Sequence, residues 1–502
     1  MKCAVAIKPL LILCLLAVTL AGCKKSSNPK PVDDDDDDTV VIPPPAKDFD
    51  INSIKDTYGE IAAFANYPKW TVHNVHDPSI KKFGDYYYSY STDVGYGIEV
   101  RSGIQIRRSK DLVDWQFVGW VFSGLPAKGS AYIQSKGGTP FNSLWAPYVL
   151  KQGSEYRLYY SLSSGVGRLS VIGLATAASP DGPWTEKDIV VISTPDSDGT
   201  RQTNAIDPTV ITTPEGEQWL YYGSGWDGIY IVKLNPATGM AAATGDKGIR
   251  IANRGFTGGR YNGNIEAPEI IYNAELKKYY LFISYDWIDT KYNVRVAKGD
   301  SPRGPFYDFN GHDINVDEDH GPMILAPYKF AGHSGYQGTA HCAVFDNGGG
   351  QYYIAHQGRP GIDKYYMNLH VRKLEWTEDG WPVVLPERYA NVAQTAVAAA
   401  DIAGNWERIA LGYRVVVGYS AEQTSPDFQN STAITLSADG KISGAATGDW
   451  TYDAPWLELK WADGTTDKVK VLRERNWQDN VVSTLVFTGL NNNGTAIWGK
   501  KK

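Results

Sequence analysis

Short apolar and aromatic runs, separated by turns rich in Gly, Pro and Asp, recur along most of the chain. A first run is followed by a Tyr-rich second run and then by a third, as in the segments that begin at Asp77, Tyr86 and Gly103. The runs are short and rich in β-branched and aromatic residues, and no stretch shows the period of an amphipathic helix. The pattern therefore predicts an all-β protein without helices.

The three-strand unit repeats at a nearly constant interval. One polar or aromatic residue at the start of each first strand marks the beginning of each unit, and successive marks are 68, 62, 59 and 75 residues apart. These marks are Asp77, Trp145, Asp207, Glu266 and His341. An all-strand repeat of this length predicts a β-propeller, whose blades cannot bury their faces alone. We expect five blades across residues 50–390, with the five first strands converging on one axis.

The unit around Asp207 is the most clearly bounded. Asp207 precedes Pro208, which predicts an extended backbone for the aspartate. A strand, a Pro-Glu-Gly turn and two further strands at Trp219–Tyr222 and Ile229–Leu234 follow. The carboxylate is thus expected at the mouth of its blade.

Residues 1–22 resemble a bacterial lipoprotein signal. Lys2 and Lys8 flank an apolar run, Leu10–Leu20, that is too short to span a bilayer and ends just before Cys23. This resemblance implies cleavage before Cys23 and a lipid on its thiol; the alternative is an ordinary secretory signal. We expect an outer-membrane lipoprotein held to the membrane by this anchor, at the cell surface or on the periplasmic side.

Residues 23–49 are rich in Pro, Ser and Asp and include six consecutive aspartates, Asp33–Asp38. Such a segment cannot bury apolar surface and is expected to be a disordered acidic tether. It carries most of the net charge of −7, and no basic stripe offsets it, which argues against nucleic acid as a partner. After removal of the signal and acylation of Cys23, only Cys342 remains, so no internal disulfide is expected.

A second domain is expected over residues 391–502, because the repeat stops near Asn391. Short alternating strands begin at Gly404, and Asp439-Gly440 and Asp463-Gly464 are turn signals. We expect a small β-barrel or sandwich that supports the propeller or binds glycan.

Three acids, Asp77, Asp207 and Glu266, occupy equivalent positions at the starts of three different predicted blades. Closure of the propeller would bring them together, and carboxylates in one pocket shift one another's pKa values. One such group can remain protonated as a general acid while another stays ionised as a base. Glycosidic cleavage requires this division of roles.

The chain from about Asp50 to Arg388 resembles the five-bladed propeller enzymes of glycoside hydrolase family 43, especially the endo-α-1,5-L-arabinanases. The resemblance is carried by VHDPSI, LWAPYV, NAIDPTV and NIEAPEI in the family's order. It implies that Asp77 is the general base, Glu266 the general acid and Asp207 the third carboxylate, which tunes and orients the acid. Inversion of configuration implies a base and an acid roughly 6.5 to 9.5 Å apart.

The resemblance also implies roles for residues around the carboxylates. Trp145 would stack on an arabinofuranose, and His341 would ligate a calcium ion together mostly with water, although calcium prefers oxygen ligands. Glu269 is expected to be structural. The positions expected to contact substrate are His76, Trp145, Asn204, Ser224, Gly225 and Trp226.

These observations together predict a monomeric, lipid-anchored hydrolase that cleaves the α-1,5 linkages of arabinan or its oligosaccharides internally, with inversion. Gly225 and Cys342 depart from the arabinanase pattern, which leaves exo attack and branched arabinan open. Trp406 and Trp498 in the second domain favour the arabinanase branch of the family. The alternatives are an exo-acting arabinofuranosidase or β-xylosidase of the same family, and a surface lipoprotein that binds glycan without cleaving it.

Overall fold

A computed structural model describes residues 49–96, 100–257, 260–261, 263–316, 321–412 and 424–502. The predicted signal, Cys23 and nearly all of the predicted tether lie outside the described residues. Every described residue belongs to one compact unit, Ile42–Lys502. Within the described ranges, no helix has the length and apolar character needed to cross a bilayer.

Four separate antiparallel sheets of four strands each are built from consecutive strands. The first contains β1 (Ser79–Phe83), β2 (Tyr86–Ser91), β3 (Gln105–Ser109) and β4 (Gln116–Trp120), and the second contains β5 (Trp145–Gln152), β6 (Glu155–Ser163), β7 (Ser170–Ala177) and β8 (Thr185–Ile192). The third contains β9 (Thr209–Thr212), β10 (Gln218–Tyr222), β11 (Ile229–Leu234) and β12 (Ile249–Ala252), and the fourth contains β15 (Ile265–Asn273), β16 (Lys278–Tyr285), β17 (Asn293–Gly299) and β18 (Met323–Leu325). The strand order predicted from the repeat is therefore present in all four.

The strands expected to form a fifth blade belong to a larger sheet of seven strands. Its strands are β19 (Tyr328–Lys329), β20 (Tyr336–Gln337), β21 (Ala343–Asp346), β22 (Tyr352–Pro360), β23 (Asn368–Trp376), β24 (Pro382–Val384) and β26 (Gln429–Asn430). The sheet is extended because β22 continues past β21, and its last residues, Arg359 and Pro360, pair with β20. The propeller thus has four separate four-stranded blades, and the predicted count of five is not confirmed.

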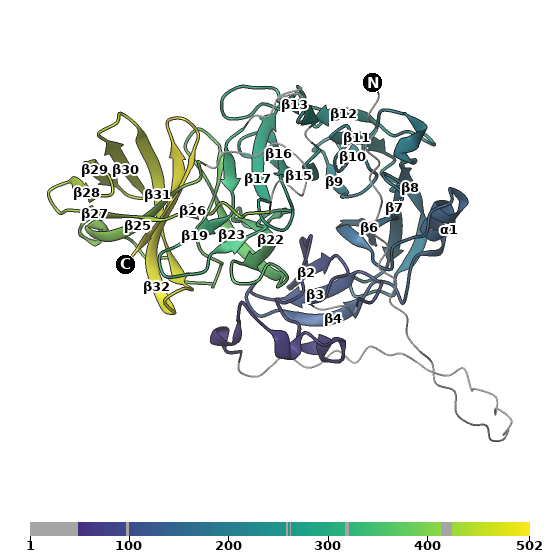
Figure 1. Cartoon of the computed structure of the whole chain (residues 1–502), viewed down its shortest axis with the longest axis horizontal. Helices are drawn as coiled ribbons and strands as arrows, with labels where there is room; N and C mark the ends of the chain where they lie inside the picture. The colour runs from purple at the N-terminus through teal and green to yellow at the C-terminus, as the bar shows by residue number, and fades with distance from the viewer. Residues whose placement is uncertain (1–48, 97–99, 258–259, 262, 317–320, 413–423) are drawn as a thin grey trace, which may run out of the picture. The chain divides into compact units, whose positions relative to one another are not determined.

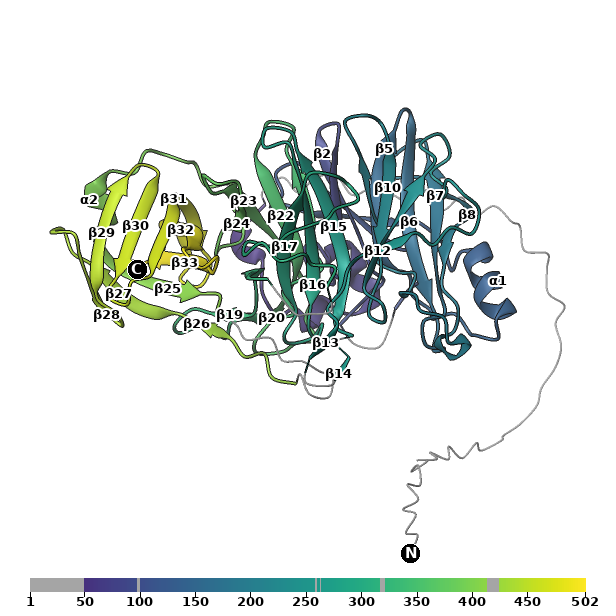
Figure 2. The ribbon, with the colours of Figure 1, turned by 90° about the horizontal axis from the view of Figure 1, so that it is seen from above.

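The sheets follow one another around a ring in Figure 1, and Figure 2, turned by 90°, shows their strands along their length. Buried apolar clusters fill the space between successive sheets, as where Ile80 and Tyr87 of the first sheet pack with Phe345 and Val371 of the seven-stranded sheet. Neither sheet could bury this face alone, so packing between sheets is what closes the ring.

Five residues at the starts of the first strands, or immediately before them, have positive φ angles between 39° and 60°. They are Asp77, Ala146, Asp207, Ala267 and His341. The extended backbone predicted for Asp207 is therefore wrong, because its φ is 60° despite the following proline. The same bend recurs at all five positions, which indicates that closure of the ring imposes it.

The backbone N–H of each of these five residues is held by a side chain that lies in the preceding sheet around the ring or within two residues of one of its strands. The N–H of Ala146 donates to Thr92 Oγ1 (2.7 Å), that of Asp207 to Ser161 Oγ (3.0 Å) and that of Ala267 to the Asp207 carboxyl group. The N–H of His341 donates to Ser284 Oγ (2.9 Å) and that of Asp77 to Gln357 Oε1 (3.2 Å). These bonds compensate buried N–H groups that no strand ladder satisfies. We call these five hydrogen bonds the axial ring.

One helix of nine residues interrupts the strands, so the expectation of a chain without helices is wrong at α1 (Ala127–Ser135). Only Gly129 and Ile133 of this helix are buried, against the second sheet, which is too weak a pattern to read as amphipathic. The other short elements are α2 (Ala399–Ile402), β13 (Phe256–Thr257), β14 (Arg260–Tyr261) and the 3₁₀ turns η1 (Ile51–Ser53), η2 (Gly59–Ile61), η3 (Phe64–Lys69) and η4 (Asp196–Asp198).

The C-terminal part of the chain forms a closed barrel of eight antiparallel strands, which decides between the predicted barrel and sandwich. Both predicted turns are present, with Gly440 and Gly464 at φ angles of 81° and 89°. The strands are β25 (Gly404–Ala410), β27 (Thr432–Leu436), β28 (Lys441–Gly444), β29 (Gly448–Asp453), β30 (Trp456–Trp461), β31 (Thr466–Asn476), β32 (Val481–Asn491) and β33 (Ala496–Lys501). The all-β class, the propeller and the barrel are thus confirmed.

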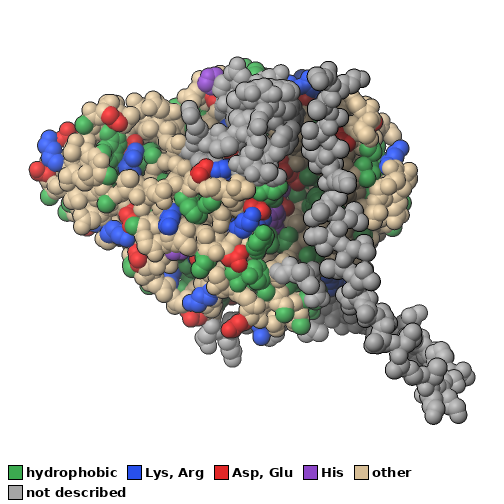
Figure 3. Space-filling view, viewed as in Figure 1, with side chains coloured by type: hydrophobic (Ala, Val, Ile, Leu, Met, Phe, Trp, Pro, Cys, Tyr) green, Lys and Arg blue, Asp and Glu red, His purple; other side chains and the backbone are tan. Residues whose placement is uncertain are grey.

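The barrel shares an apolar core with the propeller. Trp498 is fully buried in the same cluster as Val383 and Leu325, and its Nε1 donates to the backbone oxygen of Val384 at 2.6 Å. On the face in Figure 3, acidic and basic side chains are interspersed among the described residues. The interface between barrel and propeller therefore contains a continuous apolar core.

Candidate active site

Asp77 lies in a buried position just before β1 and is surrounded by polar groups. Its Oδ2 accepts a hydrogen bond from Thr92 Oγ1 at 2.7 Å and lies 2.7 Å from His76 Nδ1, while its Oδ1 lies 3.0 Å from His341 Nδ1. Burial alone would raise the pKa of Asp77, but His341 and His76 hold it well below its ordinary value. Asp77 is therefore ionised, as a base must be.

The tautomer of His76 follows from its second neighbour. Arg359 Nη2 lies 2.9 Å from His76 Nε2, and because a guanidinium can only donate, that nitrogen must accept. The proton of a neutral His76 is then on Nδ1, where it faces Asp77 Oδ2. Arg359 thus orients His76 toward the carboxylate.

Asp207 is buried at the start of the third sheet and differs from Asp77 in its surroundings. Burial raises the pKa of Asp207 well above its ordinary value, and the neighbouring carboxylates of Glu266 and Asp77 raise it further, against the opposing effect of His341. Asp207 therefore keeps its proton to a higher pH than Asp77 does. The two acids of one site are shifted in opposite directions by their environments.

Glu266 lies at the start of β15, where Ala267 introduces a bulge in the pairing with β16. Its Oε2 accepts from Ser224 Oγ at 2.7 Å, and its Oε1 accepts from Tyr292 OH at 2.6 Å. The bulge redirects the strand after one residue, so the carboxylate points away from the ladder. Two donors from different elements then fix its orientation.

His341 connects the three acids. Burial alone would lower the pKa of His341, but Asp77 raises it to about 9, with further contributions from Asp207 and Glu266. No group of three or more His, Cys, Asp or Glu side chains suited to a metal ion occurs in the described part of the chain. The protein side chains near His341 therefore do not form a calcium site by themselves, and the calcium stays a prediction that requires water ligands.

Trp145 is partly exposed and belongs to an aromatic pair. Its ring stacks on Phe141 with centroids 5.3 Å apart, and its Nε1 donates to Ser143 Oγ at 2.7 Å. Phe141 is 38% exposed, so the pair presents an apolar face to solvent. Such a face suits the CH-rich face of a sugar, as predicted for Trp145.

The segment from Ser224 to Trp226 lies against β15. Ser224 and Glu266 form an isolated bridge, Gly225 N donates to the Ile265 oxygen at 2.8 Å, and Gly225 and Trp226 have φ angles of 61° and 39°. A side chain at Gly225 would approach the Gly263 oxygen at 3.1 Å. The positive φ and this close backbone approach both favour glycine at the position that departs from the arabinanase pattern.

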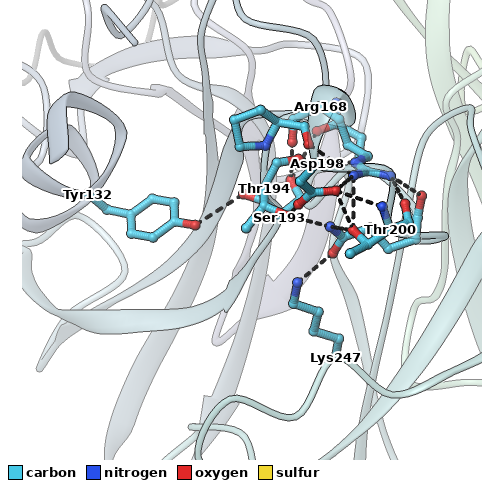
Figure 4. A network of polar contacts seen from close by, with 10 residues as sticks. Tyr132, Arg168, Ser193, Thr194, Asp198, Thr200 and Lys247 are labelled. Carbon is cyan, nitrogen blue, oxygen red and sulfur yellow. Dashed lines mark hydrogen bonds and ion pairs between the residues drawn. The ribbon is translucent and has the colours of Figure 1, made fainter. Parts of the chain in front are cut away.

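Asn204 is buried, and its Oδ1 accepts from Ser193 Oγ at 3.3 Å. Ser193 belongs to a polar network around Arg168, whose guanidinium donates to the backbone oxygen of Thr200 at 2.6 Å and to Asp198 Oδ1 at 2.9 Å (Figure 4). The network fixes the loop that leads into Asp207. Asn204 therefore has a structural partner in addition to the substrate contact predicted for it.

A cavity of about 1190 Å³ lies at the opposite ends of the first strands. Its floor includes Lys81, and the buried Glu269, 3.9 Å from Lys81, accepts from Thr209 Oγ1 and the Val344 N–H. These bonds are consistent with the structural role expected for Glu269. None of Asp77, Asp207, Glu266 and His341 lines this cavity.

The structure therefore brings Asp77, Asp207, Glu266, His76 and His341 into one electrostatically coupled cluster. It adds groups that the sequence reasoning missed. Thr92, Arg359 and Tyr292 all lie within hydrogen-bonding distance of a predicted site residue. Of these three residues, only Tyr292 could have been suspected from the sequence, because it immediately precedes a predicted third strand.

The cluster contains what acid–base hydrolysis requires. An ionised carboxylate is held by donors at Asp77. A second carboxylate, Glu266, is oriented by Ser224, which follows β10 of the third sheet, and by Tyr292, which precedes β17 of the fourth sheet. A partly exposed aromatic pair provides an apolar face of the kind that sugars stack on.

Comparison with known proteins places this cluster in a family. Two relatives similar to most of the chain are an extracellular endo-α-(1→5)-L-arabinanase of Thermotoga petrophila, 29% identical over 86% of this chain and 94% of the relative, and endo-α-(1→5)-L-arabinanase 2 of Bacillus subtilis, 28% identical over 88% and 95%. The crystal structure of the Thermotoga petrophila endo-1,5-α-L-arabinanase superposes with a TM-score of 0.73 at 28% identity, covering 86% of this chain and 98% of that one.

Two successive parts of the chain match two different protein-family models. Residues 386–499 match a C-terminal lipocalin-like domain, in agreement with the closed barrel. Residues 71–382 match the glycosyl hydrolases of family 43 and contain all the predicted catalytic carboxylates. The chain is a glycoside hydrolase and belongs to family 43.

Proposed function

We propose that this protein is an inverting endo-α-1,5-L-arabinanase that cleaves arabinan. The observation that carries the proposal is the pairing of an ionised Asp77 with Glu266, each held by its own donors, in a chain similar to endo-arabinanases over most of its length. A protein that only bound glycan would have no need for two carboxylates, each held in place by its own donors.

In the proposed mechanism, Asp77 accepts a proton from a water molecule as the water attacks the anomeric carbon. Glu266, in its protonated form, donates a proton to the leaving glycosidic oxygen. Thr92 and His76 hold the Asp77 carboxylate, and Tyr292 and Ser224 orient Glu266. Asp207, whose raised pKa favours its protonated form, limits the negative charge that the site must bear.

Inversion further requires space for the water between base and acid. The proposed separation of Asp77 and Glu266 is therefore roughly 6.5 to 9.5 Å. Trp145, Asn204, Gly225 and Trp226 are proposed to contact the arabinofuranose units on either side of the cleaved bond.

Several finer features belong to the proposal. We count β21 to β24 as the fifth blade, supported by their antiparallel pairing and by the axial ring, which needs Gln357 of β22 to hold Asp77. Lipid attachment at Cys23, a monomeric state and a calcium ion at His341 remain predictions. The extracellular labels of the relatives are in keeping with export of this chain.

A time course of products from linear α-1,5-arabinan, resolved by oligosaccharide chromatography, tests the activity. Early oligomers of intermediate length are expected. Arabinose alone would instead indicate exo attack, as named for a relative from Cellvibrio japonicus that is 30% identical over 62% of this chain.

Xylan serves as the parallel substrate. Release of sugars from xylan alone would contradict the proposal and support the β-xylosidase alternative. Binding of either polymer without cleavage would support the glycan-binding alternative. The configuration of the released product, followed by NMR, tests inversion separately.

A further inference from the structure

The barrel contributes one short segment to the region around the candidate active site. The connection between β25 and β27 includes residues 424–431, whose Gln429 and Asn430 pair in parallel with β19. Phe428 packs near Gly335 and Gly361, since a Cβ added at either glycine would come within 3.2 Å of its ring. The segment is therefore fixed to the seven-stranded sheet on both sides of its backbone.

Asp427, in this segment, forms an ion pair with Lys291 of the propeller. The Lys291 side chain is only 3% exposed, whereas Asp427 is 48% exposed. A buried ammonium needs a nearby anion, so this pair anchors the loop between β16 and β17 that carries Lys291.

The anchored loop reaches the general acid directly. Tyr292, the next residue, is fully buried and donates to Glu266 Oε1 at 2.6 Å. The backbone oxygen of Tyr292 also accepts from the Thr339 N–H at 3.2 Å, two residues before His341. A displacement of Lys291 would therefore move the phenol that orients Glu266.

The same loop also contacts the side of the general base. Asp289 accepts from Lys364 Nζ at 2.9 Å and lies 3.7 Å from Arg359 Nη1. Arg359 in turn orients His76, which faces Asp77. One loop thus contacts the supports of both catalytic carboxylates.

We propose that Asp427 of the barrel is a positioning residue for Glu266, acting through Lys291 and Tyr292. This inference rests on the proposed function, since it assigns the barrel a part in placing the general acid. It gives the second domain a role in turnover that is separate from stabilising the fold or binding glycan.

The test compares Asp427→Ala with Lys468→Met. Lys468 of the barrel pairs with Glu378 of the propeller at 2.5 Å, both side chains being about half exposed, so this variant also removes an ion pair across the same two domains. Each variant is assayed on an α-1,5-arabino-oligosaccharide and on an aryl arabino-oligosaccharide with a nitrophenolate leaving group, which needs little help from a general acid.

Asp427→Ala is expected to lower kcat on the natural oligosaccharide on the order of tenfold, with a smaller effect on the aryl substrate and little change in KM. Asp427→Glu should restore most of the rate, and Lys468→Met should behave as wild type. An equal loss on both substrates, or the same loss in Lys468→Met, would overturn the inference.

A second measurement does not depend on activity. Backbone hydrogen exchange in residues 286–292 is expected to rise in Asp427→Ala and to remain unchanged in Lys468→Met. Unchanged exchange in Asp427→Ala contradicts the inference even if the enzyme acts on another polymer. Absence of wild-type turnover on arabinan, by contrast, contradicts the proposed function alone.

Discussion

Lys500 of the barrel and Glu387, just after the last strand of the propeller, form an ion pair with Nζ and Oε1 3.0 Å apart and both side chains 1% exposed. Lys500 Nζ also donates to Asn476 Oδ1 at 3.2 Å, which satisfies part of its remaining hydrogen-bonding capacity. A pair this deeply buried is costly to break on one side only, because the surviving charge keeps its desolvation cost.

Glu387→Gln should therefore destabilise the protein by about 3 to 5 kcal/mol, because it leaves the Lys500 ammonium buried without a counter-charge. Denaturant unfolding measures the change. Glu378→Gln removes the exposed partner of Lys468 and should cost less than about 1 kcal/mol. An equal loss of unfolding free energy in the two variants would mean that burial does not determine how much each ion pair contributes to the stability of this interface.

Glu266→Gln should keep the fold and substrate binding but lower kcat on unactivated arabinan by about 10² to 10⁴. The amide oxygen can accept from one of Tyr292 and Ser224 while the amide NH₂ donates to the other hydroxyl, yet the amide has no acidic proton to give the leaving oxygen. An unchanged melting temperature together with retained oligosaccharide binding is the control. Wild-type rates in this variant would remove Glu266 from the mechanism.

Thr92→Val should impair both activity and stability, because Thr92 Oγ1 donates to Asp77 and accepts from the Ala146 N–H. The buried N–H left without an acceptor should cost about 1 to 3 kcal/mol, and kcat/KM should fall roughly tenfold as Asp77 loses a donor. Thr92→Ser retains the hydroxyl and should recover both quantities. A valine variant with normal kinetics would show that the hydroxyl does not orient the base.

The free energy of unfolding should fall as pH rises from about 4.5 to about 7, because Glu474 of β31 loses its proton over this range. Burial raises its pKa from 4.5 to about 7, although Lys373 Nζ lies 3.1 Å away and opposes the shift. The folded state thus binds the proton more tightly than the unfolded state, so this contribution is complete below pH 4.5 and is lost through pH 7. It is on the order of 3 kcal/mol.

Unfolding free energies measured across this pH range for the wild type and Glu474→Gln separate its contribution from the rest. The variant should show a flatter dependence, because the amide does not titrate. A variant as steep as the wild type would assign the slope to other groups.

The calcium prediction has a direct test in chelation. An ion bound at His341 implies that a chelator lowers the activity or the melting temperature of the wild type, and that added calcium restores it. His341→Gln should then be insensitive to the chelator. A wild type that keeps both properties after exhaustive chelation would remove the ion from this site.

Much of the propeller could be predicted because its repeat is local. Each first strand and its Tyr-rich partner lie within one segment, and the phase of Asp77, Asp207 and Glu266 placed them at equivalent positions. The family match over residues 71–382 agrees with that interpretation. The seven-stranded sheet could not be foreseen, because β22 pairs with β20 and β19 pairs with β26, which lies about 100 residues further along the chain.

The supports of the site escaped prediction for a related reason. Arg359 contacts His76 across 283 residues of sequence, and no periodicity connects the two. The positive φ at Asp207 also contradicts the local rule for a residue before proline, because ring closure and the Ser161 hydroxyl override it. Local rules locate the acids, whereas tertiary contacts decide how each acid is held.

The axial ring has a consequence for the order in which the enzyme is made. Asp77 is among the first residues of the propeller to leave the ribosome, yet its N–H is held by Gln357, which is synthesised 280 residues later. Arg359, which orients His76, follows immediately after. A nascent or truncated chain that stops before this point therefore lacks the contacts that hold Asp77 and His76, so the proposed base can be set in place only after nearly the whole catalytic domain has been translated and its two ends have met.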